Sequence, residues 1–384
     1  MNRTIDVQLN KVSPTPRSLR AHSQLDAPVA AIEINLGQLF LHKYFDGFPS
    51  GAPDPDPSSF EYLRYVSAAD DFRFHAYIAR ASLVKRREIS LNMGQAFCRL
   101  MLADHFGIIH FAHMSDVLGK SAHAAFGGMR VERVCPGDVP DYLCGDDGAA
   151  FLAEAKGRFS SIKFGSAPFS DWRAQFTRVR VVDSQNVPRS TKGYIVATKL
   201  VTDASPPAQR AATFVEDPET AGEPLGREQS LQLVRGTRAI HYSSILRKLE
   251  LTPLASALSL GYALTRQLTF QVPVWTCTAA PFQGKTYIGG YYRTRAGHGP
   301  VLTEKGWQSS LELGTSHAVF VGLQADIAAQ VSAAARGQWT ALDEIRPVGL
   351  EQLEGNWSSE FAWLPDGSVA APVLYFLPTG VMTL

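Results

Sequence analysis

Two carboxylates and one ammonium group lie within a short stretch of this chain. Asp141 follows Pro140, and Glu154 and Lys156 flank Ala155. Hard divalent cations such as Mg²⁺ prefer oxygen ligands, and a cation held in this way polarises a phosphate and lowers the pKa of a bound water. An ammonium group orients such a water or offsets the negative charge that develops on the phosphate. These residue types therefore suit a metal-dependent phosphodiesterase.

A β-hairpin would bring these side chains together. A turn-forming Gly-Asp-Asp-Gly lies between two apolar runs, which predicts a hairpin. If Gly145 faces Gly148, then Asp141 faces Leu152, and side-chain alternation places Glu154 on the same face as a diagonal neighbour of Asp141. A loop one residue longer or shorter would move Asp141 to the opposite face, so the prediction depends on the strand register.

The segments on either side of the hairpin predict the elements that position it. Apolar residues recur at helical spacing over residues 90–101, with Ser90 as a suitable N-cap and Gly107 as a stop. A second helix with a capping serine is predicted over residues 170–179. The β-rich run at residues 194–201 predicts the next core strand.

This pattern resembles the PD-(D/E)XK, or restriction-endonuclease-like, nuclease superfamily. The resemblance rests on Pro140-Asp141, on Glu154-Ala155-Lys156 and on the surrounding helix, hairpin, helix and strand, and it covers roughly residues 85–202. It implies an α/β (α+β) fold with a restriction-endonuclease-like core, in which helices flank a mixed central sheet.

The resemblance also implies roles for individual residues. Asp141, Glu154 and the carbonyl of Ala155 would bind Mg²⁺, for which Mn²⁺ can substitute, and Lys156 would act beside the metal. Some branches of the family place a glutamine near the site on the helix that follows the hairpin. Gln175 matches that position, and a plain solvated glutamine is an equally good interpretation.

Other polar residues near the motif have simpler interpretations. Gln95 stands where many family members carry a metal-binding glutamate, and since it is neutral, one-metal and two-metal sites both remain open. Glu88 could replace that glutamate and Asp138 could be a spare ligand, but a surface charge for Glu88 and a solvated loop carboxylate for Asp138 are the favoured interpretations. Asp146 and Asp147 are interpreted as turn residues.

Two functional hypotheses follow. The first is a Mg²⁺-dependent nuclease, most simply a DNA endonuclease of bacterial antiviral defence or DNA repair, a setting that rests on analogy with the family. Its implied partners are nucleic acid, with DNA favoured over RNA, a partner ATPase or helicase, and a second copy in a homodimer. The alternative is a non-catalytic nuclease-fold protein that binds nucleic acid or scaffolds a defence complex. Gln95 favours the alternative, and the retained Asp141, Glu154 and Lys156 favour the enzyme.

Composition and charge fit a globular protein. The chain has 384 residues and a formal net charge of +1, so its overall charge does not indicate nucleic-acid binding. Between residues 151 and 202, however, nine basic residues stand against three acidic ones, and this basic region could contact phosphates. A solvated face of a helix and a strand is the competing interpretation.

The chain divides into parts by composition. We expect an N-terminal extension over residues 1–60, a nuclease-like domain over 61–202, a linker or long loop over 203–229, and a C-terminal α+β domain of unassigned role over 230–384. Within the last part, aromatic Tyr287, Tyr291 and Tyr292 lie close to basic Arg293 and Arg295, a mixture that nucleic-acid readers also show, but strand residues at a sheet edge are the favoured interpretation.

The remaining sequence features indicate the compartment. Four scattered cysteines form no C-x-x-C and read as free thiols in a reducing compartment. His105, His110 and His113 match no metal template and are interpreted as structural or surface residues. The first residues lack a signal-peptide core and no apolar run could span a bilayer, so we expect a cytoplasmic protein without a membrane partner.

Overall fold

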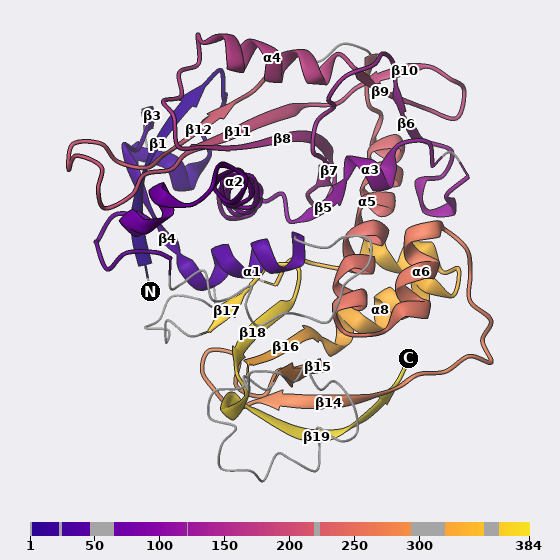
Figure 1. The fold of residues 1–384 in the computed structure, drawn as a ribbon. Coiled ribbons are helices and arrows are strands. Elements are labelled where there is room, and N and C mark those ends of the chain that lie inside the picture. Colours follow the sequence, from indigo (N-terminus) through magenta and orange to yellow (C-terminus); the bar gives the residue numbers. More distant parts are fainter. Residues whose placement is uncertain are drawn as a thin grey trace.

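The computed structural model describes residues 2–22, 25–46, 65–120, 122–218, 223–292, 319–348 and 361–384, and Figure 1 shows their arrangement. Helices pack against two large sheets, so the mixed α/β class predicted from the sequence is confirmed. The larger sheet and its helices occupy the upper part of the view, and the second sheet lies below them.

Seven strands of the described chain form the central sheet, in the order β4-β1-β12-β11-β8-β7-β5. The β1–β12 and β8–β11 pairs are parallel and the others are antiparallel. The sheet is therefore mixed, as expected. Its strands are β1 (Asn2–Asn10), β4 (Ala31–Asn35), β5 (His110–His113), β7 (Tyr142–Gly145), β8 (Ala150–Arg158), β11 (Gly193–Lys199) and β12 (Ala212–Glu216).

Helices cover both faces of this sheet. On one face, α4 (Ala167–Phe176) and α5 (Arg227–Lys248) bury Leu143, Leu152 and Ile195. On the other face, α2 (Leu83–Phe106) buries Cys144 and Ala153. The helix α1 (Leu36–Asp46) lies on the side of α2 that faces away from the central sheet (Figure 1). Because side chains alternate along a strand, Leu152 and its i+2 neighbours face α4 while Ala153 faces α2.

Two glycines bring α2 against β8. A Cβ added at Gly94 would lie 2.4 Å from the Gly157 nitrogen, and one added at Gly157 would lie 1.9 Å from the Ser90 oxygen. Only residues without a side chain permit this contact between backbones. The helix begins at the N-cap Ser82, which accepts a hydrogen bond from the Lys85 amide, and ends at Gly107 with φ +69°.

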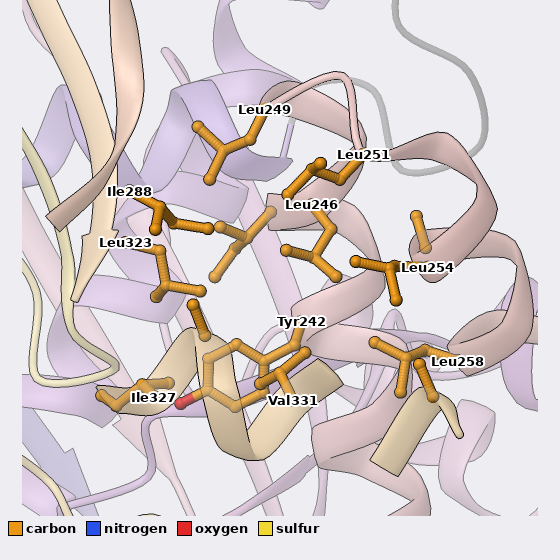
Figure 2. Close-up of a cluster of buried hydrophobic side chains, with 14 of the residues drawn as sticks. Tyr242, Leu246, Leu249, Leu251, Leu254, Leu258, Ile288, Leu323, Ile327 and Val331 are labelled. Atoms are coloured by element: carbon orange, nitrogen blue, oxygen red, sulfur yellow. The ribbon is translucent and has the colours of Figure 1, made fainter. Parts of the chain in front are cut away.

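The second sheet contains six described strands in the order β17-β18-β16-β15-β14-β19. Together with α1 and α5, the helices α6 (Thr252–Leu260) and α8 (Ala325–Ala335) bury one face of it in a core that includes Tyr242, Leu246 and Leu323 (Figure 2). The strands are β14 (Gln271–Cys277), β15 (Thr286–Tyr292), β16 (Val319–Gln324), β17 (Ala362–Trp363), β18 (Ser368–Pro372) and β19 (Phe376–Thr383). Tyr287 and Tyr291 are buried among aromatic neighbours on its other face, which confirms them as strand residues. The predicted position at a sheet edge is wrong, because β15 lies between β16 and β14.

Smaller elements complete the described chain. A four-stranded sheet in the order β13-β10-β9-β6 and a two-stranded sheet of β2 and β3 flank the central sheet. Their bounds are β2 (Arg20–His22), β3 (Leu25–Pro28), β6 (Arg130–Arg133), β9 (Val179–Val182), β10 (Pro188–Ser190) and β13 (Glu223–Pro224). The short helices are α3 (Met114–Val117), η1 (Arg17–Leu19), η3 (Ala76–Arg80), η4 (Ala124–Phe126), η6 (Trp339–Glu344) and η8 (Val373–Tyr375).

The topology differs from the division expected from composition. β1 and β4 belong to the central sheet, so residues 1–60 are not a simple extension as far as the structure describes them. β12 pairs with both β1 and β11, although it falls within the predicted linker. The turn-rich composition around β12 concealed a strand of five buried residues. No helix in the described part of the chain is long and apolar enough to cross a membrane.

Candidate active site

The hairpin of β7 and β8 sets the register of the site. Leu143 pairs with Leu152 and Gly145 with Ala150, so the predicted pairing of Gly145 with Gly148 is wrong by two residues. A shift of two preserves the face to which each side chain points. If this register continues one residue beyond the Tyr142–Ala153 pair, Asp141 lies directly opposite Glu154. The sequence had predicted a diagonal position for these two residues.

The turn explains the difference in register. Asp146 Oδ1 accepts hydrogen bonds from the amides of Gly148 at 2.7 Å and Ala149 at 2.6 Å, so the turn uses residues 146–149. This confirms Asp146 as a turn residue. Asp147 instead reaches out to Arg238 of α5, with Oδ1 3.0 Å from the guanidinium NH2, and fixes the hairpin to that helix.

Asp141, Glu154 and Lys156 come together at the start of β7. Lys156 Nζ contacts Glu154 Oε1 and lies 3.7 Å from Asp141 Oδ2. Asp141 Oδ2 also accepts a 2.8 Å hydrogen bond from the Ala155 amide, which ties the loop before β7 to β8. The Glu154 side chain is fully buried, whereas 24% of Asp141 and 26% of Lys156 are exposed. The group therefore combines one fully buried carboxylate with a partly exposed carboxylate and a partly exposed ammonium group.

Burial and the charges of neighbouring residues shift the pKa values of Glu154 and Lys156. Burial, followed by the charge of Asp141, raises the pKa of Glu154 well above its usual range, and Lys156 opposes this shift. Burial acts to lower the pKa of Lys156, but the charges of Asp141 and Glu154 outweigh it and raise that pKa. Lys156 is therefore a stable ammonium group, and an additional cation would favour the ionised form of Glu154.

The residues present fit a hard divalent cation. Within the described structure the Glu154 carboxyl interacts with Lys156 and Asp141 alone, so further lone pairs remain for a cation. The Ala155 carbonyl faces Asp141, because the N–H and C=O of one strand residue point to the same side and the Ala155 N–H bonds to Asp141. The described residues contain no group of three or more histidine, cysteine or acidic side chains suited to a metal. A Mg²⁺ ion held by Asp141, Glu154 and the Ala155 carbonyl would keep several waters, as Mg²⁺ usually does.

Two contacts place α4 along β8 and β11. The Arg158 guanidinium lies over the Trp172 ring, 5.2 Å from its centroid, near the end of β8. Phe176 packs against Gly193, where an added Cβ would lie 2.7 Å from its ring, and Gly193 pairs with Leu152. Trp172 of α4 therefore lies near the Arg158 guanidinium, and Phe176, one helical turn later, lies against Gly193 of β11.

Gln175 lies on the buried side of α4. It follows Trp172 by three residues and is 5% exposed. The Gln175 Oε1 atom is buried and accepts no hydrogen bond from the described residues. Gln175 is therefore a buried glutamine and not a solvated one, and no hydrogen bond within the described residues joins it to Asp141, Glu154 or Lys156.

The other polar residues near the motif differ in their surroundings. Gln95 is half-buried on α2, next to the Gly94 contact with β8, and brings no charge to the site. Glu88 pairs with Lys85 at 3.0 Å on the surface, as interpreted from the sequence. Asp138 is exposed, yet its charge contributes to the raised pKa of Lys156, so it lies within electrostatic reach of the site.

A second buried cluster anchors the residue next to Asp141. Asp46 Oδ1 accepts hydrogen bonds from Arg99 NH1 at 2.9 Å and from the Tyr142 hydroxyl at 2.8 Å, and it lies 3.1 Å from His113 Nε2. Tyr142 therefore holds the start of β7 against α1 and α2. No sequence motif predicted this cluster, because its four residues come from four separate elements.

Most basic residues of the region between 151 and 202 are neutralised locally. Five of the nine contact carboxylates, in the pairs Lys156–Glu154, Arg173–Glu216, Arg180–Glu132, Arg189–Asp183 and Lys192–Asp217. Three of these carboxylates lie outside the counted window, so the local excess of positive charge is smaller than the sequence suggested. For the other four, the structure describes no carboxylate partner: Arg158, Lys163, Arg178 and Lys199.

Comparison with protein-family models, with curated proteins and with solved structures found no match for this chain. Functional inference therefore rests on the residues and their geometry.

Proposed function

We propose that this protein is a Mg²⁺-dependent nuclease that hydrolyses phosphodiester bonds, with DNA as the favoured substrate and endonucleolytic cleavage as its mode. The observation that carries the proposal is the convergence of Asp141, Glu154 and Lys156 at the start of β7. Two carboxylates and an ammonium group in contact are the minimum set for this chemistry. Bacterial antiviral defence or DNA repair is the setting that the family resemblance suggests.

The order of elements around the site supports the proposal. Along the chain, α2 precedes β5, β7 and β8, which are followed by α4 and β11. In the sheet, β5, β7, β8 and β11 are neighbours in that order, with β8 and β11 parallel. The resemblance implied this succession of a helix, a hairpin, a helix and a strand in a mixed sheet.

Each residue has a distinct role in the proposed reaction. Asp141, Glu154 and the Ala155 carbonyl would hold the cation. When bound, Mg²⁺ supplies Lewis acidity toward a phosphate oxygen and an attacking water. Lys156 donates hydrogen bonds to that water or to the phosphate and offsets the charge that develops in the transition state. Gln175, which is buried on α4, would orient substrate or water through its amide.

Plasmid cleavage tests the proposal directly. We expect the wild type to nick or linearise supercoiled DNA with Mg²⁺ or Mn²⁺, and Asp141→Asn, Glu154→Gln and Lys156→Met each to lose at least about 100-fold in rate. Asp203→Asn, which changes a half-exposed carboxylate next to His75, is the matched control and should cleave normally. Activity that survives in all three site variants would exclude this site.

Metal binding provides a test that does not need the correct substrate. Titration with Mg²⁺ or Mn²⁺ should raise the melting temperature of the wild type, because a ligand that binds only the folded state stabilises it. Asp141→Asn should lose this shift. Calorimetric titration without substrate would detect the same site, and equal binding by wild type and variant would contradict the proposed ligands.

A non-catalytic nucleic-acid-binding or scaffold protein is the second candidate. It is favoured by Gln95, which leaves α2 without a carboxylate at the site, and by the direct contact between Lys156 and Glu154. This function predicts that wild type and Lys156→Met bind DNA but that neither cleaves it, even with a partner ATPase or helicase present. Metal-dependent cleavage by the wild type alone would exclude it.

A further inference from the structure

Two cations lie directly beyond the proposed active site on the same face of the sheet. Arg158 follows Lys156 by two residues on β8, so both side chains point toward α4. Lys199 of β11 pairs with Arg158 across the parallel ladder. Directly paired strand residues point to the same face, so Lys199 joins this group. The site is thus continued by a pair of positive charges on neighbouring strands.

This pairing is unfavourable for the protein alone. Like charges directly opposite each other destabilise a sheet. The structure describes no carboxylate in contact with Arg158 or Lys199, whereas five other basic residues nearby are paired. Across the sheet, Lys199 pairs with Ala212 of β12, and Ala212 pairs with Asp6 of β1. The Asp6 carboxylate contacts Arg210 at 3.1 Å. No carboxylate of the described chain therefore offsets the charges of Arg158 and Lys199.

The Arg158 side chain is also held in position. Its guanidinium stacks on Trp172, which is 4% exposed and fixed in the core under α4. Stacking of this kind orients the planar group and leaves its N–H donors available at the edge. Guanidinium groups bind phosphate through two parallel hydrogen bonds. The Arg158 guanidinium is thus held in one orientation and contacts no described carboxylate, so it can bind an anion.

The spacing matches a nucleic-acid backbone. Residues two apart on a strand lie about 6–7 Å from each other, and neighbouring strands lie about 4.8 Å apart. Arg158 and Lys199 are thus about one nucleotide step from Lys156. Resting on the proposed nuclease function, we propose that Arg158 and Lys199 bind the phosphate adjacent to the one that is cleaved. The natural substrate is then a nucleic-acid strand, and not a mononucleotide or a small phosphodiester.

Binding without cleavage tests this subsite. The probe is fluorescein-labelled DNA of about 20 nucleotides, single-stranded and duplex, in EDTA, followed by anisotropy over a range of salt concentrations. We expect Arg158→Gln/Lys199→Gln to weaken binding by at least about tenfold. The slope of log K against log salt concentration should fall in magnitude by about 1 to 2, because each phosphate contact releases counterions. The matched control, Arg180→Gln/Lys192→Gln, removes the same charge from residues that already contact carboxylates and should change neither value.

Denaturation provides the second measurement. Because the two cations repel each other, Lys199→Gln should leave the urea midpoint unchanged or raise it; a lower midpoint would show that Lys199 has a structural role and contradict the proposal. Equal affinity and equal salt slope for wild type and the double variant would also contradict it. Since no metal or cleavage is involved, the subsite can be confirmed even if the protein proves not to be a nuclease.

Discussion

Glu154 is the fully buried carboxylate of the site, and Lys156 is the positive charge beside it. Removal of one partner from a buried ion pair leaves the other uncompensated, at a cost of several kcal/mol. We predict that Lys156→Met lowers the free energy of unfolding by about 2–4 kcal/mol at neutral pH without metal. Glu154→Gln/Lys156→Met should recover most of this loss. Urea denaturation of both variants in EDTA measures the coupling, and additive losses would contradict it.

His113 predicts a pH dependence of stability at the same scale. Burial acts to lower its pKa, but the ion pair with Asp46 outweighs burial and raises that pKa; nearby Arg99 opposes the shift and Asp116 supports it. Because the pKa of His113 is higher in the folded state, its protonation stabilises the folded protein fully at pH values below the unfolded pKa of about 6.5. This stabilisation is lost as the pH rises through the folded-state pKa. His113→Gln should therefore cost more stability at about pH 6 than at about pH 9. Equal losses at both pH values would argue against the Asp46–His113 pair.

The sequence predicted the types of residue in the site better than their surroundings. Asp141, Glu154 and Lys156 were visible because they lie on one hairpin, and their common face survived a register error of two residues because strand side chains alternate. The Asp46 cluster was not predictable, since 53 residues separate Asp46 from Arg99 and 96 separate it from Tyr142. Only the assembled fold brings such residues together.

The contact of α2 with β8 determines how the site is supported. A Cβ at position 157 would overlap the Ser90 carbonyl oxygen, and backbone atoms cannot move aside as a flexible side chain can. We predict that Gly157→Ala lowers stability by about 2–3 kcal/mol and displaces Lys156, with a loss of metal binding. Gly165→Ala is the control, since nothing lies within 4 Å of its added Cβ. Thermal unfolding and Mg²⁺ titration of the two variants measure the difference.

Element boundaries were less predictable than element existence. The helix expected over residues 90–101 lies inside α2, whose N-cap is Ser82 and not the predicted Ser90. The first turns were missed because Leu83 and Val84 are exposed and give no apolar periodicity. The helix expected over 170–179 corresponds to α4, which begins at Ala167 after the N-cap Ser166. The predicted strand at 194–201 corresponds to β11 within two residues.

At the scale of the whole molecule, α5 joins the two sheets. His241 on α5 accepts a hydrogen bond from the Phe111 amide of β5 at 3.2 Å and lies 3.0 Å from Asp366, just before β18. Asp366 also accepts a 2.8 Å hydrogen bond from the Ser368 amide. We predict that Asp366→Ala lowers stability by about 2–4 kcal/mol, since buried donors lose their acceptor. If the sheets form one cooperative unit, calorimetry should still show a single transition, and two separated transitions would refute that unity.

The parallel pairing of β1 with β12 has a consequence for biosynthesis. Asn10 and Glu216, which are hydrogen-bonded at 2.6 Å, are 206 positions apart. As the polypeptide leaves the ribosome, β1 can pair early with β4 on one side, but its other edge stays open until β12 emerges. An open strand edge invites aggregation, and long-range parallel pairing forms slowly. Nascent chains should therefore engage chaperones over this interval, and the central sheet should become complete only after translation has passed β12.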